Sequence, residues 1–473
     1  MSQNKGLSLI KDILIFAVGS IGSKLILFLL VPLYTNYMTT DEYGTADLVF
    51  TVSQLLVPFV SVVIFDAVVR FGLMKTQKPQ NVLLAAFVVI TVGALVTVAL
   101  TPLLRFYSAV SEWKWYFCVY TILNMILPVE MNYLKVKNRN SLYAAGGILQ
   151  TLLLAVLNII LLTQFNLGVK GYLVSYIVAG AITVAIVFFV GGIGKALRNA
   201  RFDKKLLLEM MAFSAPLILN NISWWAIHSS NKLMIELMLS ASALGIYTVA
   251  TKIPSLINVF ISIFSQAWGI SSIKEAEDGG DKSFYSEVMT VYSTLAFSAA
   301  TVLILIIKPF MSLYVGEDFQ SAWQYVPFLL VSAVFNAISS FYGSIYSAIK
   351  KTKNNMMTTL VAAVVNIIFN LVFIRLCGVW GAVIGTVAAY IVIALARIID
   401  IQRFVKIHIN WFAFGLNCVI ILLQALCVSF GFYPYIVSAV SVAVIFATNS
   451  KIWITLFNKV LRGGKKLLSK GNN

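Results

Sequence analysis

Three lysines fall inside long apolar segments, where a charged side chain is costly to hold. They are Lys24 in segment 11–33, Lys232 in segment 211–236 and Lys252 in segment 244–268. An ionised side chain at the centre of a bilayer costs at least about 2.5–3.5 kcal/mol on insertion scales, so it usually faces a cavity or a partner. We therefore expect the three ammonium groups to line a cavity. The alternatives are a structural salt bridge and, for Lys232, snorkelling to the membrane surface.

Segment 211–236 is also the most polar of the apolar segments. Its polar side chains are Asn220, Asn221, Ser223, His228, Ser229, Ser230 and Asn231. Polar groups surrounded by lipid must find partners, so this face is expected either to look into a cavity or to bond across helices. Trp224 and Trp225 lie in the same segment and could stack against sugar rings.

Acidic residues are few in the apolar segments, and one of them, Asp66, lies close to an arginine. Asp66 and Arg70 lie one turn apart, a spacing that lets them pair on one helix face. Such a pair either neutralises itself at the membrane border or acts as a gate, and Arg70 is also a candidate for binding substrate. Asp47, Glu130 and Glu236 lie near predicted helix ends, where water is close. We interpret Asp66, Glu130 and Glu236 as candidates for gating or for coupling to H+ or Na+.

Several kinds of chemistry have no motif in this chain. There is no Walker A loop, no Gly-rich dinucleotide signature after a strand and no His-Glu-x-x-His sequence. The cysteines lie in apolar stretches without the close pairing of a zinc site: Cys118, Cys377, Cys418 and Cys427. We therefore predict a protein that is not an enzyme and has no cofactor or bound metal. Any transport would be driven by an ion gradient, by substrate supply or by a partner.

The elements that position these residues are membrane-spanning helices. The chain of 473 residues is 60% hydrophobic and 11% charged, with a mean hydropathy of +0.91. A helix rises 1.5 Å per residue, so about 20 apolar residues cross the hydrocarbon core. Segments of that kind fall near 11–33, 46–69, 82–104, 114–134, 142–163, 169–191, 211–236, 244–268, 288–308, 322–345, 356–376, 379–397, 411–430 and 433–450. The sequence predicts an all-α polytopic membrane protein with about fourteen spans.

Charge gives the orientation of these segments. The net charge is +17, and most of the Lys and Arg residues fall in alternate gaps, including Arg397, Arg403 and Lys406 in the gap before residue 411. Cytoplasmic gaps carry an excess of Lys and Arg, so these gaps are expected to face the cytoplasm. Both termini are then cytoplasmic, and nucleic acid is not an expected partner.

Short matches recur in the same order in the two halves of the chain. Tyr43-Gly44 recurs as Leu244-Gly245, Lys135 to Asn138 as Lys351 to Asn354, Asn158 as Asn366, and Gly168 to Gly171 as Gly378 to Gly381. Collinear matches at nearly constant spacing predict two pseudo-symmetric lobes of six helices. Each lobe has an even number of helices, so the copies point the same way, with a binding site between them and transport by alternating access.

The predicted division of the chain follows from this repeat. The N-lobe is 1–191, a basic cytoplasmic linker is 192–209, and the C-lobe is 210–408. Two further helices occupy 409–450, outside the repeat, and a basic cytoplasmic tail follows at 451–473.

The chain resembles the polysaccharide transporters of the multidrug, oligosaccharidyl-lipid and polysaccharide (MOP) exporter superfamily, typified by bacterial Wzx flippases. The strings that carry the resemblance are Asp41 to Gly44, Val69 to Gly72, Asn231-Lys232 and, most specifically, Leu244 to Lys252. The resemblance covers nearly the whole chain.

The resemblance implies a flippase of the bacterial cytoplasmic (inner) membrane. Its substrate would be undecaprenyl pyrophosphate carrying an oligosaccharide repeat unit of capsule, O-antigen or exopolysaccharide. A pyrophosphate brings about two negative charges, and buried lysines provide fixed cations for them. Lys24, Lys232 and Lys252 would hold the pyrophosphate, with membrane lipid, a polymerase and glycosyltransferases of the same pathway as further partners.

Other functions stay open at this point. A lipid II flippase of the same superfamily would have the same helices and cavity cations. A cation-coupled multidrug exporter should carry unpaired acids deep in its helices, where this chain has lysines. A membrane-embedded glycan polymerase or acyltransferase would need a sizeable outer loop or a catalytic histidine.

Overall fold

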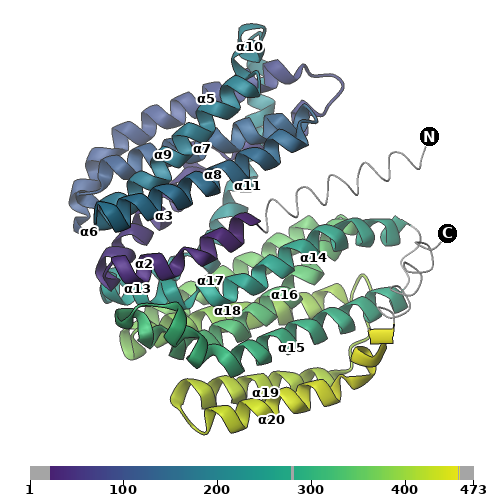
Figure 1. Ribbon diagram of the computed structural model, residues 1–473. Coiled ribbons are helices and arrows are strands. Elements are labelled where there is room, and N and C mark those ends of the chain that lie inside the picture. The colour runs from purple at the N-terminus through teal and green to yellow at the C-terminus, as the bar shows by residue number, and fades with distance from the viewer. Residues whose placement is uncertain (1–21, 278–281, 456, 459–473) are drawn as a thin grey trace, which may run out of the picture. The chain divides into compact units, whose positions relative to one another are not determined.

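The computed structural model describes residues 22–277, 282–455 and 457–458, and the regular structure within them is entirely helical (Figure 1). The all-α prediction is thus confirmed for these residues. Spatial proximity divides the chain into two compact units. The first contains the chain up to Val249 with Tyr314–Gln320 and Asn370–Val379, and the second contains Ala250–Leu313, Ser321–Phe369 and the chain from Trp380 onward.

The first unit begins with helical residues 22–29. The helices that follow are α2 (Val31–Tyr37), α3 (Thr40–Val60), α4 (Ile64–Gly72), α5 (Pro79–Leu100), α6 (Ser108–Ser111), α7 (Lys114–Val136), α8 (Asn140–Ile159), α9 (Gly168–Val190), α10 (Ile193–Arg198), α11 (Lys204–His228), α12 (Ser230–Met238) and α13 (Ala241–Ala250). Local sequence fixes where two of the long helices start. Thr39 and Glu42 form a reciprocal capping box at α3, and the Asp203 carboxylate accepts from the Lys205 and Leu206 amides at α11.

The second unit contains the remaining long helices. They are α14 (Lys252–Glu277), α15 (Lys282–Tyr314), α16 (Val326–Ala348), α17 (Thr352–Cys377), α18 (Val379–Ile401), α19 (Trp411–Phe430) and α20 (Pro434–Thr448). Helix α16 packs against α14, where the Trp268 indole stacks 4.6 Å from the Phe341 ring and donates to the Phe341 carbonyl oxygen. The Thr301 hydroxyl donates to the Gln424 side chain at 2.6 Å, which ties α15 to α19.

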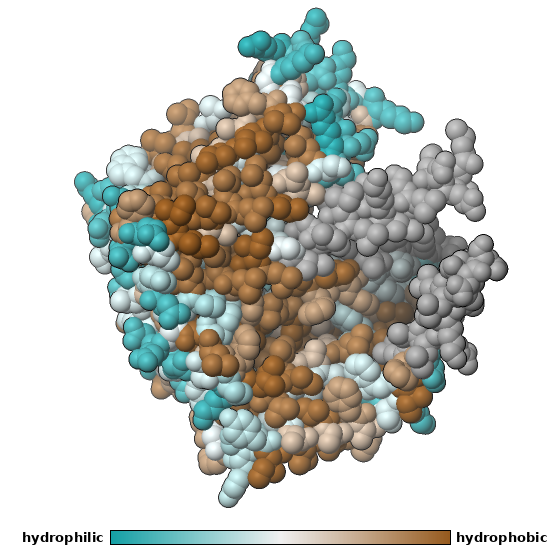
Figure 2. All heavy atoms as spheres, viewed as in Figure 1, coloured by the Kyte–Doolittle hydropathy of each residue, from teal (hydrophilic) through white to brown (hydrophobic). Residues whose placement is uncertain are grey.

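Eleven of the described helices are long and apolar enough to cross a membrane, or twelve if α13 and α14 form one bent span. On the face shown in Figure 2, apolar side chains predominate and hydrophilic ones gather around α10. Large apolar side chains such as Leu95, Phe189 and Leu313 are 66–90% exposed, as expected where lipid is the solvent. The chain is therefore a multi-pass membrane protein. Two of the fourteen predicted spans are not among these helices. Segment 11–33 begins outside the described residues, and α20, in segment 433–450, has 15 residues.

The predicted segment 46–69 is not one helix. Helices α3 and α4 are separated by Ser61, Val62 and Val63, and both valines have left-handed backbones, with φ of 51° and 53°. That conformation is costly for β-branched residues, so the surroundings must hold it. The Ser61 hydroxyl donates to the Val57 carbonyl oxygen at 2.7 Å and accepts from the Val63 amide at 3.2 Å. Gly93 of α5 has no Cβ, which lets α5 approach the Val60 carbonyl at the same break.

Candidate functional site

The starts of α3 and α13 meet through two glycines, within the first unit. A Cβ on Gly44 would collide with the Ala241 carbonyl oxygen, and one on Gly245 would collide with the Thr40 carbonyl oxygen. Each glycine therefore contacts the backbone four residues before the other. The Thr40 and Ser242 hydroxyls share a hydrogen bond of 2.7 Å at the same contact. This reciprocal pattern is that of two equivalent segments around a local two-fold axis, and these segments carry the Tyr43-Gly44 and Leu244-Gly245 match.

Lys232 of α12 forms a salt bridge beside this contact. Its Nζ lies 2.8 Å from the Asp47 Oδ2, and the two side chains are 17% and 10% exposed. The same Asp47 oxygen accepts a hydrogen bond of 3.0 Å from the Thr248 hydroxyl of α13. Lys232 thus takes the salt-bridge alternative in this structure. Asp47 is its counter-ion and joins α3, α12 and α13.

Asn231, next to Lys232, bonds across helices. Its Nδ2 donates to the Tyr247 hydroxyl at 2.9 Å, and its Oδ1 accepts from the Asn370 side chain. All three side chains are buried. Trp225 also holds helices together, since its Nε1 donates to the Thr51 carbonyl oxygen of α3 at 3.1 Å. These residues therefore fix the position of α11 and α12 in the first unit and do not line an open surface.

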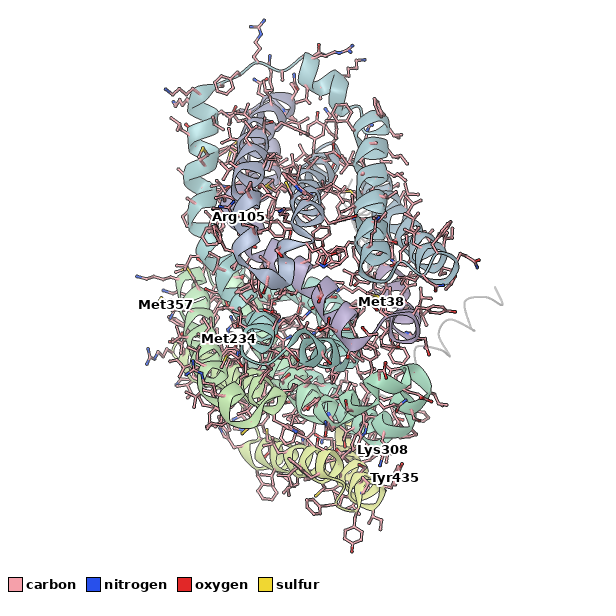
Figure 3. All side chains as sticks on the ribbon, turned by 90° about the vertical axis from the view of Figure 1, so that its left-hand side faces the viewer. Met38, Arg105, Met234, Lys308, Met357 and Tyr435 are labelled. Atoms are coloured by element: carbon pink, nitrogen blue, oxygen red, sulfur yellow. The ribbon has the colours of Figure 1, made fainter. Side chains whose placement is uncertain are left out.

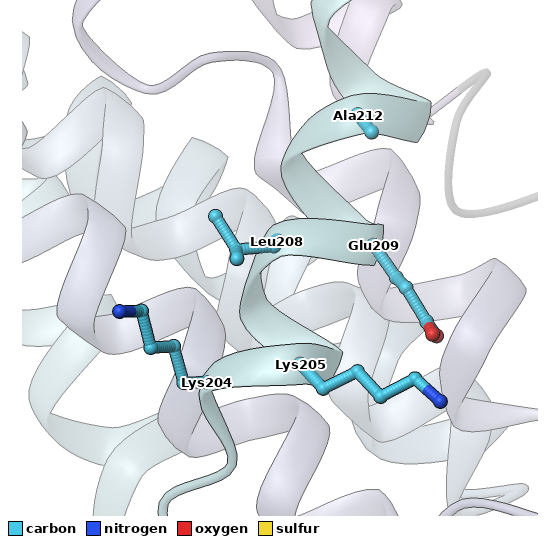
Figure 4. Close-up of a pocket in the computed structure, with 5 residues that line it drawn as sticks. All are labelled: Lys204, Lys205, Leu208, Glu209 and Ala212. Atoms are coloured by element: carbon cyan, nitrogen blue, oxygen red, sulfur yellow. The ribbon is translucent and has the colours of Figure 1, made fainter.

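The other side of α11 is open. Exposed side chains follow one another along it, and we call these residues the α11 stripe: Lys204, Lys205, Leu208, Glu209, Ala212 and Leu219. Its first five residues border an open surface hollow of about 650 Å³, with the lysines and Glu209 on successive turns (Figure 4). The Trp224 and His228 rings stack 5.4 Å apart near the other end of α11, on a different side of the helix. Asn221 is half-exposed and donates to the Leu217 carbonyl oxygen of its own helix at 3.0 Å.

Arg70 lies on α4 and its side chain is exposed, as is that of Asp66. The Arg70 guanidinium carbon lies 4.6 Å from the centre of the Phe213 ring of α11. Asp66 and Arg70, both within the described residues, do not form an ion pair with each other. A guanidinium stacked on an aromatic ring keeps its planar donors available for a phosphate.

The other two predicted lysines belong to other segments of the chain. Lys24 is exposed within helical residues 22–29 of the first unit. Lys252 is the first residue of α14, directly after the break at Thr251, and belongs to the second unit. Each is placed within its own unit, and their joint contribution to one cavity stays a prediction.

Glu130 does not lie against water, contrary to the expectation for a residue near a helix end. It is 0% exposed, and both carboxylate oxygens lack a hydrogen-bond partner among the described residues. Leu123 and Leu134 of α7 face Gly180 and Gly191 of α9, and Glu130 occupies the same stripe of α7 between them.

Glu236 differs from Glu130, because it has a partner near the end of α12. It accepts a hydrogen bond from the Tyr107 hydroxyl. Burial, followed by this bond to Glu236, raises the pKa of the Tyr107 phenol. Glu236 therefore links α12 to the turn before α6.

Arg397 was expected in a cytoplasmic gap, and that expectation is wrong. The residue lies inside α18 and is 1% exposed. The predicted apolar segment ends at this residue, whereas the helix continues for four further residues, to Ile401. No group of three His, Cys, Asp or Glu side chains in the described ranges could hold a metal ion.

Solved structures of other membrane proteins share this fold. A solved structure of the lipid II flippase MurJ, in an inward closed conformation, superposes with a TM-score of 0.71 at 12% identity and covers 94% of this chain and 100% of that chain. An outward-facing multidrug resistance MATE transporter of the MOP superfamily gives a TM-score of 0.60 at 16% identity, over 83% of this chain and 96% of that one. The chain therefore shares its fold with both of these proteins.

The sequence also matches a protein family. Residues 9–268, more than half of the chain, match the family described as polysaccharide biosynthesis protein, and the chain belongs to that family. The resemblance seen in the sequence is thereby confirmed. An uncharacterized membrane protein of Haemophilus influenzae is 22% identical over 333 residues, which are 69% of this chain and 80% of the relative.

Proposed function

We propose that the protein is a flippase that moves an oligosaccharide linked to undecaprenyl pyrophosphate from the inner to the outer leaflet of the bacterial cytoplasmic membrane. The family membership and the MurJ-like fold support a lipid-linked substrate of polysaccharide biosynthesis. The observation that carries the proposal is Arg70, an exposed guanidinium that stacks on Phe213 and is not paired with the nearby Asp66. Such a group suits an oxyanion, because its fork of donors matches a phosphate.

Each part of the first unit has a role in this proposal. Arg70 and Lys24 are exposed cations that would receive the pyrophosphate. The Trp224 and His228 pair near the end of α11 offers ring faces to a sugar, which binds aromatic rings through its apolar edges. Lys232 is neutralised by Asp47 in this structure, so it would meet the substrate in a state in which that pair has opened. Lys252 would contribute from the second unit.

The test is reconstituted flipping of a pyrophosphate-linked oligosaccharide in liposomes, with Arg70→Gln as the main variant. Removing one charged hydrogen-bond donor to a phosphate costs about 1.5–3 kcal/mol, so flipping should fall about tenfold or more. Lys75→Gln is the matched control, because Lys75 is an exposed cation just beyond α4. Equal flipping by Arg70→Gln and Lys75→Gln would remove Arg70 from the proposed site.

A lipid II flippase is the second candidate, and the fold shared with MurJ is the observation that favours it. Both substrates carry a pyrophosphate, so the cations alone do not separate the two. The lipid that accumulates in a deletion strain does. A repeat-unit intermediate is expected to accumulate, and accumulation of lipid II would replace our proposal. A cation-coupled drug exporter fits less well, because its mostly cationic substrates would be repelled by the positive charge of Arg70.

A further inference from the structure

A groove lies between the start of α17 and the end of α18, within the second unit. It has a volume of about 570 Å³ and is lined by Lys353, Asn354, Met357, Thr358, Ala396, Ile399, Asp400 and Arg403. The groove lies next to the gap that contains Lys350, Lys351 and Lys353, and the positive charge of this gap predicts that it faces the cytoplasm. The groove combines cations at its rim with apolar side chains along one wall.

The single acid of the groove is already engaged. The Asp400 Oδ2 accepts from the Tyr346 hydroxyl at 2.8 Å and from the Asn354 Nδ2 at 2.9 Å. Its Oδ1 lies 3.4 Å from the Arg403 Nη1, and the Arg403 side chain remains 75% exposed. Lys353 is exposed as well. The rim therefore has more positive than negative charge.

A buried arginine adds to that excess from behind the groove. The Arg397 Nε donates to the Thr358 hydroxyl at 3.2 Å, and Thr358 lines the groove. The other donors of Arg397 reach the Ser339 carbonyl oxygen at 2.8 Å, the Ser339 hydroxyl at 3.1 Å, the Thr359 hydroxyl at 2.9 Å and the Asn355 carbonyl oxygen at 3.4 Å. All of these partners are neutral, so none of these hydrogen bonds goes to a carboxylate. A fixed cation in a low-dielectric region favours an anion nearby.

The apolar wall continues along the same two helices. On α17, Met357, Val361 and Val364 are 45–49% exposed, and Figure 3 shows Met357 at the edge of the molecule. On α18, Leu395 and Ile399 are 40% and 65% exposed. Hydrocarbon chains could lie along these side chains while a polar headgroup stays at the rim.

We propose that this groove binds an anionic glycerophospholipid, with the headgroup phosphate between Lys353 and Arg403 and the acyl chains along Met357 and Ile399. Basic pockets between membrane helices on the cytoplasmic side are suited to such headgroups. The charge of Arg397 behind Thr358 makes the site selective for negative over zwitterionic lipid. The proposal is independent of the substrate that the protein moves.

The experiment counts lipids bound to the purified full chain by native mass spectrometry, with phosphatidylglycerol and phosphatidylcholine as probes. Phosphatidylglycerol is expected to bind more tightly. Lys353→Gln and Arg403→Gln should each weaken it about fivefold, because each cation near a lipid surface contributes on the order of a fivefold change in affinity. Asp400→Asn should have the opposite effect: it should raise the affinity for phosphatidylglycerol about fivefold, because the negative charge is lost, while the amide oxygen still accepts the hydrogen bond from Tyr346.

Lys350→Gln is the matched control, since Lys350 is exposed on the same turn but does not line the groove. Equal binding of the two lipids, or a loss in Lys350→Gln as large as in Lys353→Gln, would overturn the proposal. A polyprenyl phosphate that displaces phosphatidylglycerol from the wild type, but not from Arg403→Gln, would assign the groove to the carrier lipid instead.

Discussion

At the scale of single residues, the charge that matters most to the interpretation is Lys232. Its ammonium group is paired with Asp47, and Asp47 also accepts from Thr248. A cation held by a carboxylate is not available to a phosphate until the pair separates. Under the proposed function, Asp47 competes with the substrate for Lys232, and substitutions of the two residues should have opposite effects on binding.

We expect Lys232→Gln to weaken binding of a soluble polyprenyl pyrophosphate analogue about tenfold or more, because a charged donor is lost. Asp47→Asn should leave binding equal or tighter, since the ammonium group loses its internal partner while the Thr248 hydrogen bond can persist. Isothermal titration of both variants measures the difference. Equal weakening by both would show that the pair serves only to hold helices together.

The sequence indicates which residues are candidates for the site, but it does not indicate which residues they bond to. Lys232 was singled out by its depth in an apolar segment, but its counter-ion is far away in the chain, and no local spacing points to it. The seven polar residues of segment 211–236 form one set in the sequence. In the structure Asn231 and Trp225 bond to other helices, whereas Trp224 and His228 stack on each other within α11. Helical phase alone does not tell which neighbour occupies each side.

At the scale of helices, the contact between α3 and α13 makes a direct prediction. The Thr40 and Ser242 hydroxyl oxygens are 2.7 Å apart, so cysteines at both positions should form a disulfide. With Cys118, Cys377, Cys418 and Cys427 replaced by alanine, Thr40→Cys with Ser242→Cys should lose flipping under mild oxidant and recover it with reductant. The reason is that the bond would keep the two helix starts together.

Each single cysteine variant serves as the control and should flip normally under oxidant. Full activity of the cross-linked double variant would show that this contact stays closed throughout transport. The readout separates a locked protein from a misfolded one, because a misfolded variant would not recover with reductant.

The position of a helix is predictable from the sequence where the length of an apolar segment determines it. Breaks within such a segment are not predictable in this way. The predicted segment 411–430 coincides with α19, whereas 46–69 is divided at Ser61 to Val63. Val is among the residues least suited to a left-handed backbone, so a Val-Val pair gives no sign of a break. Tertiary contacts from Gly93 and the Ser61 hydroxyl stabilise it, and these are invisible to a local pattern.

At the scale of the whole molecule, the orientation in the membrane remains a prediction from charge. With the native cysteines replaced, a single cysteine at Ser108 should react with an impermeant maleimide on intact cells, because that exposed residue is on the predicted outer side. A cysteine at Asn199, exposed in the basic linker, should react only after permeabilisation. The reverse pattern would invert the topology and the direction of transport that we propose.

The reciprocal glycine contact also has an evolutionary consequence. In a symmetric dimer of two identical halves, one mutation at the glycine would change both contacts at once, because each half would present the same surface. In this chain Gly44 and Gly245 are separate codons, so one contact can loosen while the other keeps its close approach. The two contacts can therefore change independently of each other, which a single substitution in a homodimer could not achieve.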